Sequence, residues 1–267
     1  MLDMLFPNRP EGRPPVIGMV HLAPLPDAPG YDGDLERVRR RALRDAEALA
    51  EGGVDALMLE NFGDAPFYPG RVPAHVVAHM SVIAARVRQA FDLPLGINCL
   101  RNDALSALAI AHAAGGGFIR VNILTGARVT DQGLVQGQAH DLLRERERLR
   151  AHAIRILADV DVKHSTALGA ARPLAEEVTD LIRRGLADGV IVSGGGTGLP
   201  TDRGQVRAVK HAAGGTPVFI GSGVTPGTAR EYARLCDGLI VGTALKRAGS
   251  AGNAVDARRV RELMAAL

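Results

Sequence analysis

The chain has 267 residues, enough for one large α/β domain or two small ones. Hydrophobic residues make up 46% of it and charged residues 23%, as in an ordinary globular protein, and no apolar run reaches the roughly 20 residues that span a bilayer. The net charge of +3 is weak evidence for nucleic-acid binding, because no basic stripe is interleaved with aromatic residues. The two cysteines lie far apart without metal-ligand spacing. We therefore expect a soluble cytoplasmic protein with no disulfide framework, no integral membrane segment and no nucleic-acid partner.

Short β-branched runs alternate with longer amphipathic patterns from residue 16 onward. We predict strands over residues 16–22, 56–61, 95–100, 118–123, 155–163, 189–193, 218–221 and 238–242. Helices are predicted near residues 34–51, 74–91, 103–114, 137–152, 174–185, 203–213, 226–235 and 253–266. This alternation indicates parallel strands joined by crossover helices. Eight such units in roughly 250 residues favour a single (β/α)8 TIM barrel.

The competing fold is a doubly wound open sheet. That fold normally carries the motif Gly-x-Gly-x-x-Gly after its first strand, whereas the first predicted strand here continues into His-Leu-Ala-Pro-Leu-Pro at residues 21–26. The barrel is therefore favoured. We expect one domain over residues 1–267, of which residues 1–14 form a short, Pro-rich N-terminal extension without the pattern of a secretory signal.

The connections that follow the predicted strands are long, whereas those that follow the helices are short. In a barrel the strand-to-helix loops emerge on the carboxyl face, where active sites of this fold lie. The long connections cover residues 23–33, 62–73, 124–136 and 194–202. Because the segment 124–136 is long and lies near charged strand ends, we expect it to be a mobile lid that excludes water from the site.

Polar residues at alternate positions near the strand ends should point into the barrel mouth, because strand side chains alternate between two faces. The pattern Asp-Val-Asp-Val-Lys at residues 159–163 predicts that its three charged side chains face the mouth together. A ring of charges at a solvated mouth can bind a polar substrate and supply acid–base groups. The candidate catalytic residues are His21, Glu60, Asn98, Arg120, Asn122, Asp159, Asp161 and Lys163.

The same residues allow other interpretations. A structural salt-bridge network would join Glu60, Arg120, Asp159 and Lys163. A metal site would use His21, Glu60, Asp159 and His164, but no tight ligand motif supports it, and we expect neither a metal nor another cofactor. A Ser-His-Asp triad would use Ser165, His164 and Asp161, but no Gly-x-Ser-x-Gly motif accompanies it.

Glycine-rich turns follow the last three predicted strands. Glycine lets the backbone approach a ligand and direct N–H groups at an anion, and the loops after strands seven and eight are the recurrent phosphate site of barrels. The alternative is that these glycines only make tight turns. The triple glycine at 194–196 is not part of a P-loop, because no Gly-Lys-Ser/Thr follows it. The candidate phosphate-binding residues are Ser193, Gly194, Gly195, Gly221, Ser222, Gly223, Gly242 and Thr243.

Several strings of the chain resemble the BtpA/SgcQ family, and the resemblance covers roughly residues 14–265. They are VHLAPLP (20–26), ENFGDAPF (60–67), GINCLRND (96–103), FIRVN (118–122), TDQG (130–133) and LADVDVKH (157–164). The resemblance implies a β/α barrel of the ribulose-phosphate-binding kind. Its cyanobacterial members are named for photosystem I biogenesis, and others are labelled phosphoribosylanthranilate isomerases. That isomerase uses a cysteine base at the end of strand one, where this chain has His21.

These observations lead to three hypotheses about function. The first is a cytoplasmic enzyme that isomerises, epimerises or cleaves a small phosphorylated sugar or nucleoside-like compound, with acid–base chemistry at His21, Glu60 and one of the two aspartates 159 and 161. The second is a non-catalytic assembly or regulatory protein, like those of photosystem I biogenesis, that uses the barrel to bind a phosphorylated ligand. The third is Schiff-base chemistry at Lys163. In each case we expect a homo-oligomer.

Overall fold

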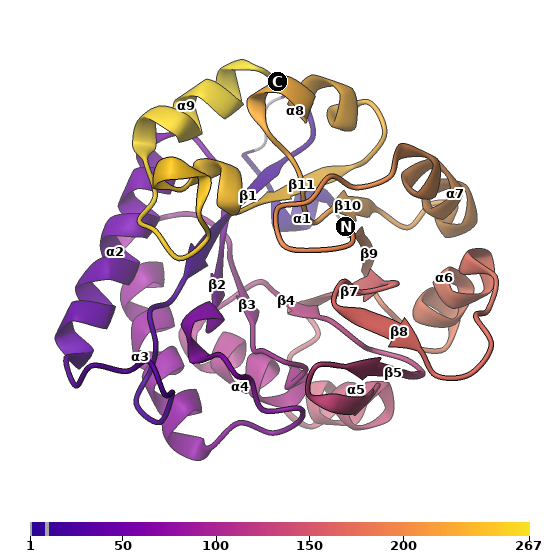
Figure 1. The fold of residues 1–267 in the computed structure, drawn as a ribbon, viewed down its shortest axis with the longest axis horizontal. Helices are drawn as coiled ribbons and strands as arrows, with labels where there is room; N and C mark the ends of the chain where they lie inside the picture. The colour runs from indigo at the N-terminus through magenta and orange to yellow at the C-terminus, as the bar shows by residue number, and fades with distance from the viewer. Residues whose placement is uncertain (1, 9–10) are drawn as a thin grey trace.

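The computed structural model describes residues 2–8 and 11–267. Eight parallel strands form a closed barrel, in which β1 pairs with β2 on one side and with β11 on the other (Figure 1). This closure confirms the predicted (β/α)8 barrel and excludes the open sheet. In chain order the barrel strands are β1 Val16–His21, β2 Ala56–Glu60, β3 Leu95–Asn98, β4 Phe118–Val121, β7 Arg155–Val160, β9 Gly189–Val192, β10 Val218–Ile220 and β11 Gly238–Val241.

A layer of helices surrounds the barrel (Figure 1). The side chains of Asp34, Asp103 and Asp202 each accept a hydrogen bond from the backbone N–H three residues further on. Such caps define where a helix begins. Among the described residues, no helix is long and apolar enough to cross a membrane. The surrounding helices are α2 Leu35–Glu51, α3 Ala74–Ala90, α4 Ala104–Ala114, α5 Ala139–Arg148, α6 Leu174–Arg183, α7 Arg203–Ala213, α8 Pro226–Ala233 and α9 Ala257–Ala265.

Most elements are somewhat shorter than the sequence pattern predicts, and for two of them the structure shows the cause. The helix α9 begins at Ala257 rather than at 253, because the side chain of Asp256 caps it by accepting a hydrogen bond from the N–H of Arg258. The strand β7 ends at Val160 rather than at 163. Asp161 has a φ of 47°, in the left-handed region, and this conformation cannot continue an extended strand.

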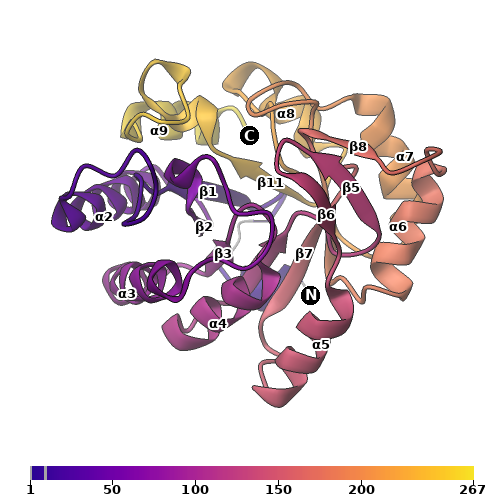
Figure 2. The same cartoon turned by 60° about the horizontal axis from the view of Figure 1, so that its bottom comes forward.

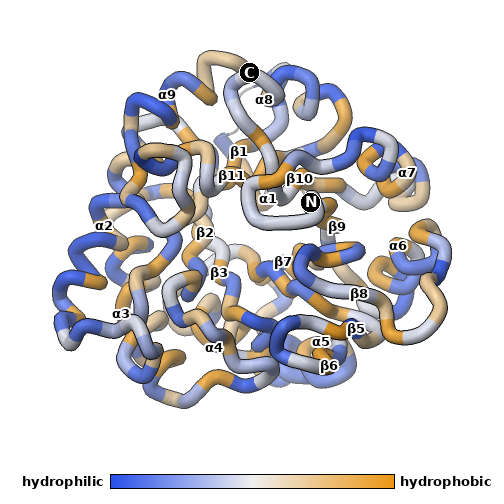
Figure 3. Tube along the Cα trace, viewed as in Figure 1, coloured by the Kyte–Doolittle hydropathy of each residue, from blue (hydrophilic) through white to orange (hydrophobic). Residues whose placement is uncertain are grey.

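The strands separate an inner core from an outer one. Outward-facing residues such as Val20, Leu59 and Val160 pack with the helices, whose outer sides are largely hydrophilic (Figure 3). Inward-facing residues fill the lower barrel as a second apolar cluster, which includes Ile17, Met19, Met58, Phe118, Leu157, Ile191, Phe219 and Ile240. A barrel interior filled in this way is a packed core rather than a pore. Such packing leaves space for a ligand at an end of the barrel rather than inside it.

The N-terminal segment closes the amino end of the barrel. The short helix α1, Leu2–Leu5, lies beneath the strands at the far end in Figure 1. The ring centroid of Phe6 lies 6.5 Å from that of Phe118 and 6.5 Å from that of Phe219, and Phe6 is 1% exposed. The predicted extension 1–14 thus contains a plug that completes the inner core; its residues 1, 9 and 10 lie outside the described residues.

A small antiparallel sheet lies over the carboxyl ends of β4 and β7 (Figure 2). Its strands are β5 Ala127–Thr130, β6 Gly133–Gln136 and β8 Ser165–Ala167, in the order β6-β5-β8. The segment 124–136, expected as a loop, is therefore a β-hairpin whose turn is formed by Asp131 and Gln132. Whether this hairpin moves as a lid stays a prediction.

Candidate active site

The topmost inward-facing residue of each barrel strand lies at the carboxyl end of the barrel. Alternation along each strand puts these residues two positions above the apolar cluster of the lower barrel. Alternation predicts five of them, on the first five barrel strands, and the glycine-rich turns predict the other three as phosphate-binding residues. Going along the chain they are His21, Glu60, Asn98, Arg120, Asp159, Ser193, Gly221 and Gly242. The barrel thus changes from apolar to polar within one layer of side chains.

Asp159 is the most completely bonded residue of this layer. Its carboxylate accepts two hydrogen bonds from Arg120, Nε to Oδ2 and Nη2 to Oδ1, each 2.8 Å long. Asn122 Nδ2 donates to Oδ2 at 3.1 Å, and Ser193 Oγ donates to Oδ1 at 3.0 Å. Asn98 supports this cluster from the neighbouring strand β3, since its Nδ2 donates to the backbone oxygen of Arg120 at 3.1 Å. Asp159 therefore holds Arg120 in place, as the structural salt-bridge interpretation predicts for these two residues.

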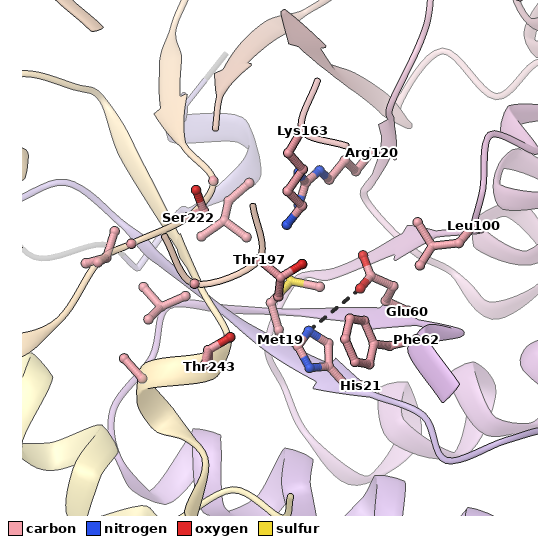
Figure 4. A pocket seen from close by; sticks show the side chains of 18 of the residues that line it. Met19, His21, Glu60, Phe62, Leu100, Arg120, Lys163, Thr197, Ser222 and Thr243 are labelled. Atoms are coloured by element: carbon pink, nitrogen blue, oxygen red, sulfur yellow. Dashed lines mark ion pairs between the residues drawn. The ribbon is translucent and has the colours of Figure 1, made fainter. Parts of the chain in front are cut away.

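His21 and Glu60 form a second cluster, on β1 and β2. His21 Nε2 lies 3.7 Å from Glu60 Oε1 (Figure 4), and the imidazole stacks on the ring of Phe62 with centroids 4.5 Å apart. Burial, followed by the charges of Lys246 and Lys163, lowers the pKa of His21 to about 3. Burial raises the pKa of Glu60, against the opposing effect of Arg120. At neutral pH the histidine is therefore uncharged, and the glutamate holds its proton more tightly than an exposed one.

Lys163 extends from the segment after β7 into the same space as Glu60 (Figure 4). Its backbone oxygen accepts a hydrogen bond of 2.7 Å from Arg101 Nη2, which holds the segment against the barrel mouth. Burial, followed by the positive charge of Arg120, lowers the pKa of Lys163 to about 8.

Asp161 does not face the mouth, so the prediction that all three charged residues of 159–163 face it is wrong at this position. The left-handed backbone at Asp161 turns its side chain outward, where it pairs with Arg128 and accepts a hydrogen bond of 3.2 Å from Gln205 Nε2. The side chain is 47% exposed. The same turn brings Lys163 back to the mouth.

A cavity of about 800 Å³ occupies the mouth. One wall carries His21, Glu60, Arg120, Asn122 and Lys163. Asn98 and Asp159 lie beneath the lining and support it. The opposite wall is formed by the turns that follow β10 and β11, with Gly221, Ser222, Gly223, Gly242 and Thr243. One enclosed space therefore brings together most of the predicted catalytic residues and most of the predicted phosphate-binding residues.

The glycine turns leave backbone donors unoccupied. Within the described part of the chain, the N–H groups of Gly223, Gly242 and Thr243 have no hydrogen-bond acceptor. Gly223 has a φ of 72°, and a Cβ at this position would lie 2.4 Å from Cα of Pro200, so only glycine fits there. By contrast, the N–H of Gly221 donates to the backbone oxygen of Val192, as part of the barrel. These free donors are of the kind that binds an anion.

Three predicted phosphate-binding residues do not line the cavity. The hydroxyl group of Ser193 donates its hydrogen bond to Asp159, and the N–H of Gly194 donates to Ser222 Oγ at 2.6 Å. Gly195 is exposed at the surface. Gly194 instead allows the loop to pack against itself, because a Cβ at this position would lie 2.4 Å from the backbone oxygen of Pro200. Two later residues of the same loop, Thr197 and Gly198, line the cavity in their place.

Sequence reasoning missed several other lining residues. Met19 lies two positions before His21 on β1, so alternation could have identified it. Asp131, at the turn of the hairpin, and Arg259, on α9, also line the cavity, and no local pattern indicates either of them. The four residues of the considered metal site, His21, Glu60, Asp159 and His164, do not gather as ligands, and no group of three such side chains does so among the described residues.

Comparisons with known proteins agree with this architecture. The model of the BtpA family matches residues 12–267. The chain is 49% identical over 253 residues to the Photosystem I biogenesis protein BtpA of Synechocystis sp., covering 95% of this chain and 88% of that protein. It is 45% identical over 252 residues to an uncharacterized protein of Thermococcus kodakarensis, covering 94% of each.

A solved structure shares the fold. Phosphoribosyl anthranilate isomerase from Thermus thermophilus aligns with a TM-score of 0.57 at 13% identity, covering 94% of this chain and 97% of that one. Identity this low shows a common barrel and nothing of the reaction. The family match and the two relatives extend over nearly the whole chain and agree with the strings that first indicated the family. The chain belongs to the BtpA family.

Proposed function

We propose that the protein is an enzyme that transfers protons on a small phosphorylated compound, in the manner of an isomerase, epimerase or lyase. One observation carries the proposal: a single cavity holds the free N–H groups of the turns after β10 and β11 on one wall and the His21–Glu60 pair on another. A phosphate bound to the N–H groups would anchor the ligand. Its carbon skeleton would then lie over the acid–base pair.

In this proposal His21 is the general base. Its Nδ1 lies 3.1 Å from the backbone oxygen of Ala251, and a carbonyl oxygen can only accept, so Nδ1 carries the hydrogen. The unprotonated Nε2 then directs its lone pair toward the cavity. With a pKa of about 3, the imidazole is uncharged at neutral pH and is a weak base, so it would take a proton only from a C–H bond that a neighbouring carbonyl or imine has made acidic. A positioned base of this kind contributes roughly 10²–10⁴-fold to a rate.

Glu60 supplies the matching acid. Burial raises its pKa, which favours the protonated form that can donate to a substrate oxygen. Arg120 also lines the cavity, and its charge would stabilise negative charge that develops on that oxygen. Two neighbouring groups whose protonation preferences differ in this way divide the roles of base and acid between them.

Anion binding is tested by a charge introduced at Thr243. Saturating phosphate should raise the melting temperature of the wild type by several degrees, since a ligand at about 100 times its Kd stabilises by about 2.7 kcal/mol. Thr243→Glu places a carboxylate at the site and should abolish the gain. Thr243→Gln is the matched control, because it has the same shape without the charge, and it should keep at least half of the gain. Equal gains in both variants would contradict the phosphate site.

Proton transfer is tested by exchange with solvent. Phosphorylated aldoses and ketoses are incubated with the protein in D₂O, and deuterium at the carbon next to the carbonyl is followed by NMR. We expect incorporation with the wild type and a loss of about 10²-fold or more with His21→Gln. Unphosphorylated sugars serve as the control and should exchange much more slowly.

The second candidate is a non-catalytic binding module that acts in assembly or regulation. It is favoured by the name of the Synechocystis relative, which refers to photosystem I biogenesis. Such a module needs the anion site and has no use for a base and an acid in the same cavity. Phosphate stabilisation without deuterium incorporation into any phosphorylated sugar would support the module and contradict the enzyme.

A further inference from the structure

The three lysines of the chain have different environments. Lys210 forms an ion pair with Asp237 at the surface. Lys246 is fully buried, and its Nζ donates to Asp45 Oδ2 at 3.0 Å. Lys163 lines the cavity at the barrel mouth. Two of the three amines are therefore neutralised by a carboxylate, and the third faces the space where a ligand would bind.

The amine of Lys163 has no partner. In residues 2–8 and 11–267, Nζ has no hydrogen-bond acceptor and no carboxylate within ion-pair distance. Asp159, the carboxylate on the strand that precedes Lys163, already accepts hydrogen bonds from Arg120, Asn122 and Ser193. Glu60 acts on Lys163 only at longer range. A partly buried charged amine without a partner lowers the stability of the protein, so its presence favours a role in binding a ligand.

The surroundings also favour the neutral amine. Burial and the adjacent Arg120 lower the pKa of Lys163 to about 8, so a fraction of the side chain is unprotonated and nucleophilic near neutral pH. The backbone on both sides is held, by Arg101 Nη2 on the oxygen of Lys163 and by Ser165 Oγ on the oxygen of Val162. The amine is thus presented from a fixed backbone into the cavity.

We propose that Lys163 forms a Schiff base with the carbonyl carbon of a phosphorylated aldehyde or ketone bound at the mouth. The inference rests on the proposed function and names its substrate class and covalent intermediate. The geometry supports it, because His21 on β1, Glu60 on β2 and Lys163 in the segment after β7 project into one space (Figure 4). The phosphate would occupy the N–H groups of the turns after β10 and β11.

The steps balance without an oxidant or a further reactant. The neutral Nζ attacks the carbonyl carbon, and a proton passes from nitrogen to oxygen to give a carbinolamine. Glu60 then donates its proton to the hydroxyl group, the C–O bond breaks, and water leaves as the C=N bond forms. The resulting protonated imine draws electrons from the neighbouring C–H bond more strongly than a carbonyl does. His21 Nε2 takes that proton, and an enamine forms. Reprotonation of the enamine would isomerise the substrate. In a lyase, the same enamine would form by cleavage of a carbon–carbon bond instead.

A purely electrostatic role for Lys163 is the alternative. An ammonium group could attract the phosphate as a point charge, without covalent chemistry. Arginine keeps the positive charge but cannot form a Schiff base. Lys163→Arg therefore separates the two roles.

The experiment traps the imine by reduction. The protein is treated with sodium borohydride in the presence of dihydroxyacetone phosphate, glyceraldehyde 3-phosphate or ribose 5-phosphate, and each lysine is examined by peptide mass spectrometry. Lys210 is the internal control for unspecific reductive alkylation, because it lies at the surface in the same chain. We expect at least tenfold more adduct on Lys163 than on Lys210 with one or more of these probes. Dihydroxyacetone and ribose should give little adduct.

Each outcome of these experiments either supports or overturns the Schiff base at Lys163. Labelling of Lys163 no greater than that of Lys210 with all three probes overturns the Schiff base. If these probes nevertheless raise the melting temperature, the phosphate site and the proposed function stand without the covalent step. If Lys163→Arg retains the deuterium incorporation of the wild type, the covalent step is likewise overturned. Specific labelling, together with loss of that incorporation in Lys163→Arg, supports it.

Discussion

Asp159→Asn is the substitution that best tests how the barrel mouth is held together. The aspartate side chain is 0% exposed and accepts four hydrogen bonds, two of them from an Arg120 side chain that is itself 4% exposed. Asparagine has nearly the same shape, but it carries no charge and has only one acceptor oxygen. Whichever way the amide is turned, its NH₂ group faces at least one N–H of Arg120.

The burial of the ion pair sets the expected loss in the free energy of unfolding. Most single substitutions cost about 0.5–3 kcal/mol, but removing one partner of a buried ion pair leaves an uncompensated charge and costs about 3–5 kcal/mol. We expect the free energy of unfolding to fall by that amount, which corresponds to roughly 2–4 °C in melting temperature for each kcal/mol in a chain of this size. With a stability of about 10 kcal/mol, in the middle of the usual range for proteins, the variant would stay folded.

Urea denaturation followed by circular dichroism measures the effect, and the double variant Asp159→Asn/Arg120→Gln is the control. The double variant removes both the carboxylate and the buried guanidinium charge, so it should be more stable than Asp159→Asn alone. The folded single variant should also lose phosphate-sugar binding, since Arg120 would no longer be held at the cavity wall. If Asp159→Asn cost less than about 1 kcal/mol, or if the double variant were the less stable of the two, the uncompensated-charge reasoning would be wrong.

Three further outcomes are expected. Lys163→Met should raise the free energy of unfolding by about 1–3 kcal/mol at pH 7. This gain should shrink as the pH rises from about 8 towards the ordinary lysine value of 10.5, because the folded wild type then loses the proton that burial makes costly; urea titrations across this range measure it. Phe6→Ala should cost about 3–5 kcal/mol in the same assay yet leave the stabilisation by phosphate unchanged, since Phe6 lies at the opposite end of the barrel. Amides of the hairpin at 127–136 should exchange hydrogen faster than those of the barrel strands and slow down when ribose 5-phosphate binds, whereas protection equal to the strands in the free protein would contradict a lid.

The fold and the ring of residues at the mouth could be predicted because both follow from a repeating pattern. Alternation within each strand identifies His21, Glu60 and Asn98 as inward-facing without knowledge of their partners. The pattern fails where a long-range contact overrides it. Asp161 leaves the expected face because Arg128 on the hairpin and Gln205 on α7 bind its carboxylate, and neither contact is visible in the local sequence.

Two other features were beyond the reach of local patterns. The plug formed by α1 and Phe6 depends on packing against Phe118 and Phe219, more than a hundred residues away along the chain, and a helix of four residues has almost no sequence signal. The glycines at 194 and 195 match the composition of an anion site, but tight packing against Pro200 accounts for Gly194. Composition predicts that a loop approaches something closely and leaves open whether that is a ligand or its own backbone.

The contrast between Asp159 and Lys163 separates the structural part of the mouth from the part that awaits a ligand. Both residues carry charge at the same end of the barrel, yet Asp159 has four donors and Lys163 has no partner among the described residues. Gly223 and Thr243, whose N–H groups have no acceptor among the described residues, line the same cavity as the unpaired amine. Unpaired polar groups raise the free energy of the empty protein, and a ligand that satisfies them gains that free energy on binding. A phosphate for the N–H groups and a carbonyl carbon for the amine, carried on one small molecule, would satisfy both sets at once.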